Sequence, residues 1–178
     1  MSPPPSACQL FVQRVTRAFM LNNGHDTTTI SALRILSAKP GLVRARLPIG
    51  SHNVNRLGSV HGGLICTLVD TMGSLALASK GLYSTGVSTD IHTTFAKAAG
   101  KAGDEVDVLG EVTTLGRTLA TTRVEVRHPV SDALLAFGSH TKFVGKAFGH
   151  EENVEFDESG EKVVKGKQPE EWGDVRLH

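Results

Sequence analysis

The stretch HGGLICTLVDTMGSLALASK (residues 61–80) decides how the rest of the chain has to fold. From Leu64 to Lys80 its apolar residues fall on nearly every side of a helix, which is typical of a helix that is buried all round. Asp70 stands in the middle of this run, and no cation lies three or four residues away from it. Because burying an unpaired carboxylate costs several kcal/mol, Asp70 needs a partner from elsewhere in the fold or a chemical function.

The residues His61-Gly62-Gly63 stand where this helix begins. The first N–H groups of a helix have no partner within it, and the positive end of the helix dipole lies there, so this end can stabilise an oxyanion. Glycines let a ligand approach the backbone closely. Two plainer interpretations stay open: the glycines only permit the turn into the helix, and His61 is a structural hydrogen bonder.

The spacing along this helix has a consequence for assembly. At about 1.5 Å of rise per residue, Asp70 lies roughly 10 Å along the axis from Gly63. One helix therefore cannot present both to the same carbon atom. If both serve one reaction, the second must come from another copy, with two such helices antiparallel across a twofold axis. This premise predicts a homodimer.

The rest of the chain predicts one helix followed mainly by strands. Residues 8–21 suit an amphipathic helix, Thr27 to Leu47 looks extended with a turn at Pro40-Gly41, and residues 50–60 form a polar loop. Further strands are expected at 87–96, 104–114, 117–127 and 134–144. Short turns join consecutive strands, so they should pair antiparallel. We expect an α+β fold: one curved antiparallel sheet wrapped about the long central helix, with an N-terminal helix beside it.

The composition changes after residue 148. Acidic residues dominate from Gly149 onward and large apolar residues thin out, which favours a flexible tail. We therefore expect one domain over residues 1–148 and an acidic tail over 149–178, in which Trp172 is the one residue suited to docking.

Composition and missing motifs exclude several classes of function. A net charge of +1 with one Trp and one Tyr gives little basis for binding nucleic acid. No stretch approaches the roughly 20 apolar residues of a membrane span. The chain has no G-x-S-x-G, P-loop or G-x-G-x-x-G motif, and its histidines and two distant cysteines lack zinc-ligand spacing, so we predict no metal.

Compartment stays open between cytoplasm and mitochondrion. The first 25 residues carry Arg14 and Arg17 but no acid before His25, which is faintly similar to a transit peptide. The stronger interpretation is an ordinary helix of the domain. With Cys8 and Cys66 far apart, we expect a reducing compartment.

A longer pattern resembles a known family. It consists of Asn55-x-x-Gly58-x-x-His61-Gly62-Gly63 followed by Leu68-Val69-Asp70, with further matches at Gly86-Val87-Ser88-x-Asp90, at 116–120 and at 140–142. From about Leu10 to Gly145 the chain resembles hotdog-fold thioesterases of the PaaI type, and among them the eukaryotic branch called thioesterase superfamily member 2, or acyl-CoA thioesterase 13. The tail after Gly149 has no counterpart in this pattern.

The resemblance implies hydrolysis of acyl-CoA at sites on a dimer interface, with dimers pairing into homotetramers. Asp70 would be the general base or nucleophile, and the Gly62 N–H would polarise the thioester carbonyl. Asn55 would orient the carbonyl or the water, and Ser88, from the same chain as Asp70, would position the water. His61 would support the site. No cofactor is implied, because coenzyme A is part of the substrate.

Substrate contacts are expected along the path of the pantetheine and the nucleotide. Period-two alternation predicts that Ser88 shares a strand face with Asp90, His92 and Thr94, opposite Val87, Ile91 and Phe95. Coenzyme A carries phosphates, so cations should edge the site. The expected substrate-binding residues are Gly63, Phe95, Ala96, Lys97, Gly116, Arg117, Thr118, His140 and Lys142. Medium- to long-chain fatty acyl groups are the expectation from the family.

Two other functions compete with hydrolysis. A non-catalytic acyl-CoA-binding hotdog module is the main alternative, although binding alone gives no reason to bury Asp70. A hydratase or dehydratase of the same fold is a weaker one, since such enzymes resemble an Asp-x-x-x-x-His arrangement and no histidine follows Asp70 before His92.

Overall fold

A computed structural model describes residues 4–21 and 23–173 of the 178-residue chain. Its α-helices are α1 (Ala7–Met20), α2 (His25–Ile30) and α3 (Gly62–Ala78). Three short 3-10 helices are η1 (Ser51–Asn53), η2 (Ala147–Gly149) and η3 (Pro169–Glu171). The strands are β1 (Arg34–Lys39), β2 (Leu42–Pro48), β3 (Val87–Phe95), β4 (Glu105–Leu115), β5 (Leu119–Arg127), β6 (Leu134–Phe143), β7 (Glu155–Phe156) and β8 (Val163–Lys165).

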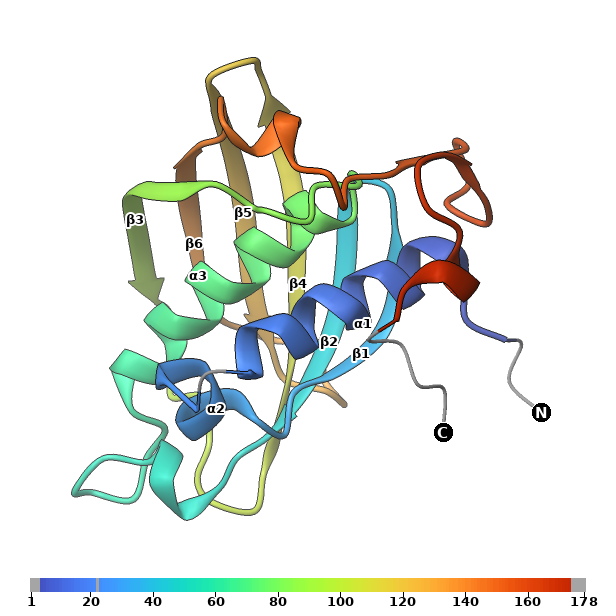
Figure 1. The fold of residues 1–178 in the computed structure, drawn as a ribbon. Coiled ribbons are helices and arrows are strands. Elements are labelled where there is room, and N and C mark those ends of the chain that lie inside the picture. The colour runs from blue at the N-terminus through green and yellow to red at the C-terminus, as the bar shows by residue number, and fades with distance from the viewer. Residues whose placement is uncertain (1–3, 22, 174–178) are drawn as a thin grey trace.

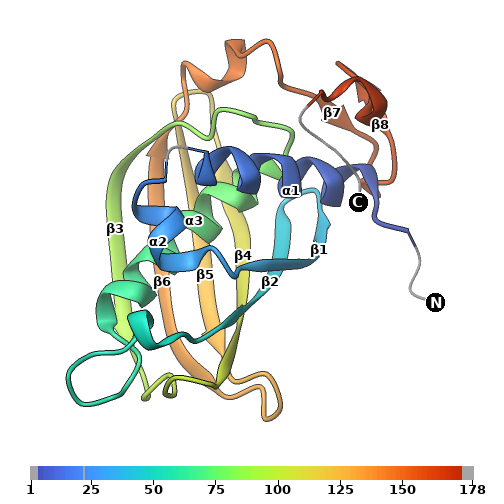
Figure 2. The same ribbon diagram turned by 60° about the horizontal axis from the view of Figure 1, so that its bottom comes forward.

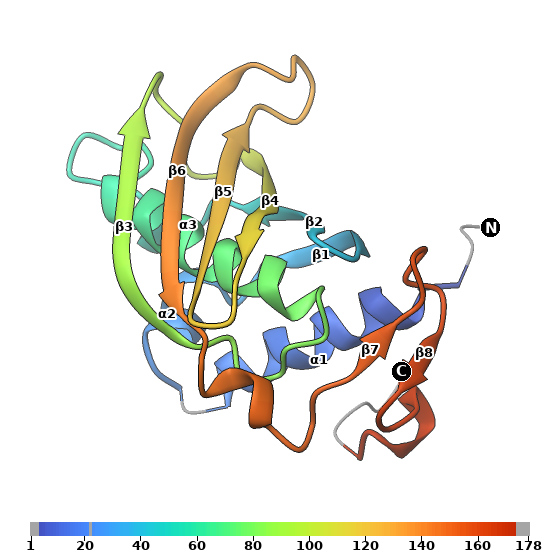
Figure 3. The same ribbon diagram turned by 90° about the horizontal axis from the view of Figure 1, so that it is seen from above.

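The main sheet is antiparallel, with the strand order β1-β2-β4-β5-β6-β3. It curves around α3, which lies in its concave face (Figure 1 and Figure 3). Helix α1 packs against α3 and β1, on the far side from β3 (Figure 2). This arrangement confirms the predicted hotdog fold, and it leaves β3 at the edge of the described sheet, paired with β6.

Glycines set how closely α3 approaches the sheet. A Cβ added at Gly110 of β4 would lie 2.5 Å from the Met72 carbonyl oxygen, and one at Gly138 of β6 would lie 2.9 Å from the Val69 methyl carbons. On the helix itself, a Cβ at Gly73 would lie 2.5 Å from Thr122 Oγ1. These distances are below ordinary contact, so the packing of helix on sheet requires glycine at these positions.

Helix α3 is not buried all round, and this part of the expectation was wrong for the single chain. Gly63 and Cys66 are exposed, and the Asp70 side chain keeps 49% of its surface accessible. These three residues follow one another at i, i+3 and i+7, so they lie along one side of the helix. We call them the open stripe of α3. The stripe is open because none of the described strands lies beyond β3 in the sheet order.

The segment from Thr27 to Ile30 is helical, not extended as expected. Gly24 precedes α2 as its N-cap residue, and the Thr28 hydroxyl donates to the Gly24 carbonyl at 3.2 Å. The helix is also held by α3, because Thr67 Oγ1 lies 2.9 Å from the ring of His25. Tertiary contact thus overrides the β preference of the three consecutive threonines.

A β-bulge at Thr89 reverses the expected faces of β3. The register shifts between Ser88 and Asp90, so Ser88 lies opposite Lys142 and Ile91 lies opposite His140. Directly opposed residues share a face, and the β6 residues here face α3 because both are buried. Ser88 therefore shares its face with Ile91 and Phe95, whereas the sequence placed it with Asp90, His92 and Thr94.

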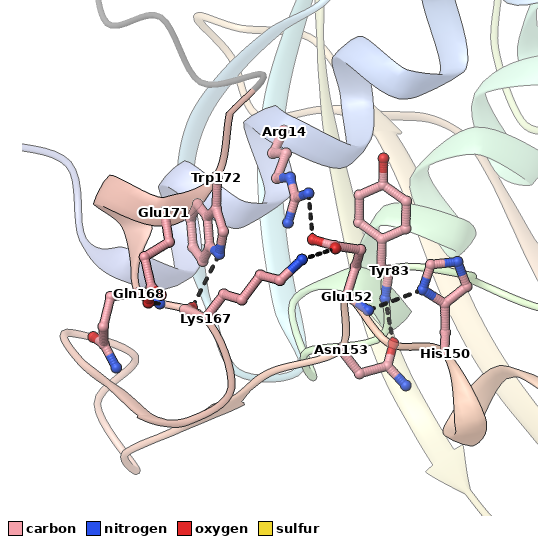
Figure 4. Close-up of polar contacts among 9 residues, drawn as sticks. All are labelled: Arg14, Tyr83, His150, Glu152, Asn153, Lys167, Gln168, Glu171 and Trp172. Atoms are coloured by element: carbon pink, nitrogen blue, oxygen red, sulfur yellow. Dashed lines mark hydrogen bonds and ion pairs between the residues drawn. The ribbon is translucent and has the colours of Figure 1, made fainter.

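The C-terminal segment from 149 to 173 packs against α1, which differs from the flexible tail that we expected (Figure 4). Trp172 is 2% exposed, and its ring meets Phe11 edge-to-face at a centroid distance of 5.3 Å. Arg14 forms an ion pair with Glu152 at 2.6 Å, and Lys167 pairs with the same carboxylate. A few apolar side chains spaced among the acids provide this packing: Val154, Phe156, Val163 and Trp172. The domain boundary at residue 148 stays a prediction.

The described helices include none with the length and apolar character to cross a bilayer. Helix α1 contributes Phe11, Val12 and Val15 to the core, each fully buried, so it is part of the domain.

Candidate active site

Chemically useful groups gather at two places along α3. The first, which we call the donor end, comprises Asn55, His61, Gly62, Gly63 and residues 95–97, where the helix begins. The second, which we call the acid cluster, comprises Asp70, Ser88, His140 and Lys142, near the middle of the helix. The sequence named every one of these residues and separated Gly63 from Asp70, but it did not group His140 and Lys142 with Asp70.

At the donor end, Gly62 holds the available amide. The Nδ1 atom of His61 accepts the Gly63 N–H at 2.8 Å, which caps the helix. The Gly62 N–H has no acceptor among the residues that the structure describes. Gly62 can therefore donate to a ligand, whereas the Gly63 amide is already used. His61 supports the site in this geometric sense, by fixing the first turn of α3.

Asn55 shapes the loop before the helix. Its side-chain oxygen accepts the N–H of Leu57 at 2.9 Å and the N–H of Ser59 at 3.3 Å. Its Nδ2 group has no acceptor among the described residues. Asn55 can thus donate to a carbonyl oxygen while its own oxygen holds the loop.

A hollow of about 280 Å³ adjoins the donor end. Phe95, Ala96 and Lys97 line it together with Gly62, and a Cβ at Gly62 would touch the Phe95 ring at 3.4 Å. Lys97 is exposed. The structure therefore brings these three predicted substrate residues to the amide that could hold a carbonyl.

The acid cluster is built from side chains on three elements. His140 Nδ1 lies 3.1 Å from the main-chain carbonyl of Asp70, and His140 Nε2 lies 2.8 Å from Ser88 Oγ. A carbonyl oxygen only accepts, so Nδ1 carries a proton, and in the neutral ring Nε2 accepts the Ser88 hydroxyl. The Asp70 carboxylate lies 3.6 Å from the same Nε2 atom. Sequence analysis missed this linked arrangement.

Electrostatics favour a neutral imidazole in this cluster. Burial lowers the pKa of His140, the positive charge of Lys142 lowers it further, and Asp70 acts in the opposite direction. The pKa of Lys142 is itself lowered by burial, against the attraction of Asp70. His140 at 0% and Lys142 at 4% exposure do not fit the phosphate-binding role that we expected.

The alternation of β6 carried a signal for this burial. His140 and Lys142 follow Ala136 and Gly138 at two-residue spacing, so all four face α3. Ala136 and Gly138 are small residues typical of a buried strand face, so the same face should also bury His140 and Lys142.

A second hollow of about 350 Å³ lies over the acid cluster. Asp70, Ser88 and Lys142 line it, together with Asp26 of α2 and Phe19 of α1. Asp26 accepts the Thr71 hydroxyl at 3.2 Å and was not singled out from the sequence. The hollow thus holds two carboxylates and an aromatic ring.

The remaining predicted residues lie at the far end of the sheet from the donor end. Gly116, Arg117 and Thr118 form the exposed turn between β4 and β5, at the top of Figure 1. The Thr118 carbonyl accepts the N–H of Val144, which places this turn by the end of β6. Among the described residues no group of three or more His, Cys, Asp or Glu side chains could hold a metal.

Within one chain the two places do not converge. Gly62 and Asp70 are eight residues apart, which is about 12 Å along the axis of α3. Gly62 nevertheless begins the helix next to the exposed Gly63, and Asp70 lies on the same open stripe as Gly63. The arrangement can act on one carbonyl carbon only if a second copy supplies the missing half.

Comparison with known proteins identifies the family. A model of the thioesterase superfamily matches residues 57–132. A provisionally named esterase of Schizosaccharomyces pombe is 41% identical over 143 residues, which are 80% of this chain and 88% of that protein. Human acyl-coenzyme A thioesterase 13 is 34% identical over 116 residues, which are 65% of this chain and 82% of the human protein.

Solved structures agree with this assignment. Zebra fish thioesterase superfamily member 2 superposes with a TM-score of 0.70 at 34% identity, covering 75% of this chain and 96% of that one. A hypothetical thioesterase protein of Streptococcus pneumoniae, determined with coenzyme A, gives a TM-score of 0.60 at 26% identity, covering 65% and 87%. By sequence and by fold, the chain belongs to the thioesterase superfamily.

Proposed function

We propose that this protein hydrolyses acyl-CoA thioesters to a free acid and coenzyme A, at sites that two protomers share. Two relatives support the substrate class, because one is named an acyl-coenzyme A thioesterase and another was determined with coenzyme A. The observation that carries the shared site is the placement of the free Gly62 amide at the start of α3 and of the Asp70 carboxylate on its open stripe.

The chemistry needs an oxyanion donor and a base. The Gly62 N–H and the Asn55 Nδ2 group donate to the thioester carbonyl oxygen, and they stabilise the negative charge that develops on it. Asp70 of the partner subunit takes a proton from water, which attacks the carbonyl carbon. The tetrahedral intermediate then collapses, the C–S bond breaks, and the coenzyme A sulfur leaves with the electron pair. The protonated Asp70 gives its proton to this thiolate, which restores the base.

Ser88 positions the attacking water. Its hydroxyl hydrogen is directed to His140 Nε2 at 2.8 Å, so the lone pairs of its oxygen are free to accept from a water beside Asp70. We assign Asp70 the role of base because Ser88 prepares a water there. In the nucleophile alternative, Asp70 forms a mixed anhydride with the acyl group as the C–S bond breaks. Where water then attacks the Asp70 carbonyl carbon, an oxygen atom from solvent stays in that carboxyl group, which mass spectrometry after one turnover in ¹⁸O-water can detect.

The dimer that this mechanism requires uses the β3 edge and the open stripe of α3. Val87, Ile91 and Phe95 are exposed on β3 at 68%, 40% and 56%, and the edge offers unpaired backbone groups for a second copy. We also propose pairing of dimers into tetramers, medium- to long-chain fatty acyl groups as substrates, and a cytoplasmic or mitochondrial location. These three extensions rest on the family resemblance alone.

Hydrolysis of a series of acyl-CoAs by the full chain tests the function. Wild type should cleave medium- and long-chain thioesters, and Asp70→Asn should lower kcat by about 10²- to 10⁴-fold, the usual contribution of a general base. Asp132→Asn is the control, because Asp132 is a 78% exposed carboxylate outside both halves of the site. Product should be followed by chromatography, since the exposed thiol of Cys66 reacts with thiol reagents.

Undiminished turnover by Asp70→Asn would contradict the assigned base. No turnover of any acyl-CoA, combined with saturable binding of coenzyme A, would favour the non-catalytic binding module. A monomer in analytical ultracentrifugation at assay concentrations would contradict the shared site.

A further inference from the structure

Lys142 is a buried lysine in the wall of the hollow that also holds the proposed base. Its Nζ atom donates to Ser74 Oγ at 2.5 Å and to Thr85 Oγ1 at 3.4 Å, and only 4% of the residue is exposed. It lines the same hollow as Asp70 and Ser88. Burying an ammonium group is costly, and two hydroxyls offset only part of this cost. A lysine kept here at such a cost calls for an explanation in the chemistry of the site.

We propose that Lys142 is a positioning residue of the thioesterase site: its buried ammonium group keeps His140 from taking a second proton, and so leaves Asp70 and Ser88 free to act on water. The inference rests on the proposed function. It replaces the phosphate-binding role expected from the sequence, which burial does not allow.

The charges around His140 make Lys142 the group that opposes its protonation. Asp70 of α3 and Asp90 of β3 both favour the charged imidazole, and Asp26 of α2 faces the same hollow. On β5, the residue opposite His140 is the uncharged Thr122. Burial disfavours the charged ring first, and the positive charge of Lys142 adds to that effect.

Protonation of His140 would disable the acid cluster in two ways. His140 Nε2 would become a donor, so it could no longer accept the Ser88 hydroxyl at 2.8 Å. The charged ring would also pair with the Asp70 carboxylate, whose nearer oxygen lies 3.6 Å away. A carboxylate engaged by a buried cation is a weaker base. Lys142 reaches Ser74 and Thr85 instead, so it supplies positive charge without bonding to the base.

The pH dependence of the Lys142→Met variant tests the proposal. Neutral His140 is the active form, so activity falls as pH drops through its pKa, and removal of Lys142 should move this acidic limb to higher pH. We expect kcat/KM to fall by roughly tenfold near pH 6, a fraction of what a general base contributes, and by less near pH 8. Lys142→Gln serves as a second variant that keeps a polar partner for Ser74. Lys146→Met removes an exposed lysine just after β6 and should leave the profile unchanged.

Nitrogen NMR of the histidine rings gives a readout that does not depend on turnover. The His140 ring should titrate at higher pH in Lys142→Met than in wild type, with the assignment made by a His140→Gln variant. In an Asp70→Asn background, Lys142→Met should change the remaining rate little, because the base through which it acts is gone.

The outcomes separate the two proposals. Turnover by wild type with an acidic limb and a His140 titration that both stay unmoved in Lys142→Met would overturn the positioning role alone. Absence of any turnover by wild type would overturn the proposed function.

Discussion

The two halves of the proposed site are built in opposite ways. The donor end offers a main-chain amide at the start of a helix, and its protein contacts are local, such as the His61 cap on Gly63 at 2.8 Å. The acid cluster consists of side chains from α3, β3 and β6. Hydrogen bonds link its buried members, His140 and Lys142, to Ser88, to the Asp70 carbonyl and to Ser74. One half is a feature of backbone geometry, and the other depends on tertiary packing.

This difference shows what each half tolerates. Any residue except proline keeps the amide at position 62, so substitutions of Gly62 should matter only through shape, whereas substitutions of Asn55 remove a side-chain donor. The acid cluster should respond to any change of charge or hydrogen bonding, since its members share one network. A single chain cannot form a complete active site, because α3 places Gly62 and Asp70 at positions eight residues apart along its axis.

Gly62→Pro should produce the largest effect of the variants at the donor end. Gly62 is the first residue of α3, a position that suits proline, and His61 before it has φ −70° and ψ 135°, which proline permits. The substitution removes one N–H, so kcat should fall by about 10²- to 10³-fold with little loss of stability. Gly62→Ala is the matched control, because it adds a Cβ and keeps the amide. Equal losses in the two variants would mean that crowding against Phe95 causes the defect.

Mixing the two inactive variants tests whether the halves come from different chains. Gly62→Pro and Asp70→Asn should each be nearly inactive alone. After denaturation and refolding together, random pairing should restore about a quarter of wild-type activity, because half of the dimers are mixed and carry one intact site of two. Absence of any recovery, with mixed dimers verified by differently sized tags, would place both halves of a site in one chain.

Ser88→Ala should have a smaller effect at the acid cluster. It removes the hydroxyl between the proposed water and His140, and we expect kcat to fall by roughly tenfold with KM little changed, because Ser88 orients the water and does not take its proton. Thr94→Val on the same strand is the control. A loss as large as that of Asp70→Asn would instead give Ser88 a direct part in bond making.

Disulfide cross-linking at Cys66 tests how the α3 helices of two protomers pair, and it leaves the proposed catalytic residues unchanged. If Gly62 faces Asp70 of the partner subunit across a twofold axis, the residue midway between them faces its own copy, and that residue is Cys66. Diamide should therefore link two chains through Cys66, and Cys66→Ser should prevent the linkage. Cys8 will not interfere, because it is fully buried and burial raises the pKa of its thiol to about 12. Absence of a linked dimer on a non-reducing gel would reject this crossing point.

Periodicity predicted most of the fold. The extended stretch with a turn at Pro40-Gly41 corresponds to β1 and β2, and the apolar run after Gly63 marked α3. What escaped prediction was set by tertiary contacts. The threonines of α2 prefer strands in isolation, and in the C-terminal segment only Trp172 was expected to dock, whereas Val154, Phe156 and Val163 pack as well.

The candidate site likewise has residues that the sequence singled out and contacts that it did not predict. Asp70 stands out as a carboxylate in an apolar run and Gly62 as part of the start of the helix, whereas Asn55 was named only through the family resemblance. The hydrogen bond from Ser88 to His140 joins residues 52 positions apart, and no local pattern encodes such a link. The burial of Lys142 could have been inferred from its spacing to Gly138.

The bulge at Thr89 lets β3 hold Ser88 on the side of α3 although Ser88 and Ile91 are three positions apart. Loss of the Thr89 codon would remove the bulge, leave Ser88 opposite Lys142 and restore regular alternation, so the Ser88 side chain would still point toward His140. The extra residue is thus carried by the strand without displacing the site. Deletion of Thr89 should therefore be far less harmful than removal of the serine hydroxyl.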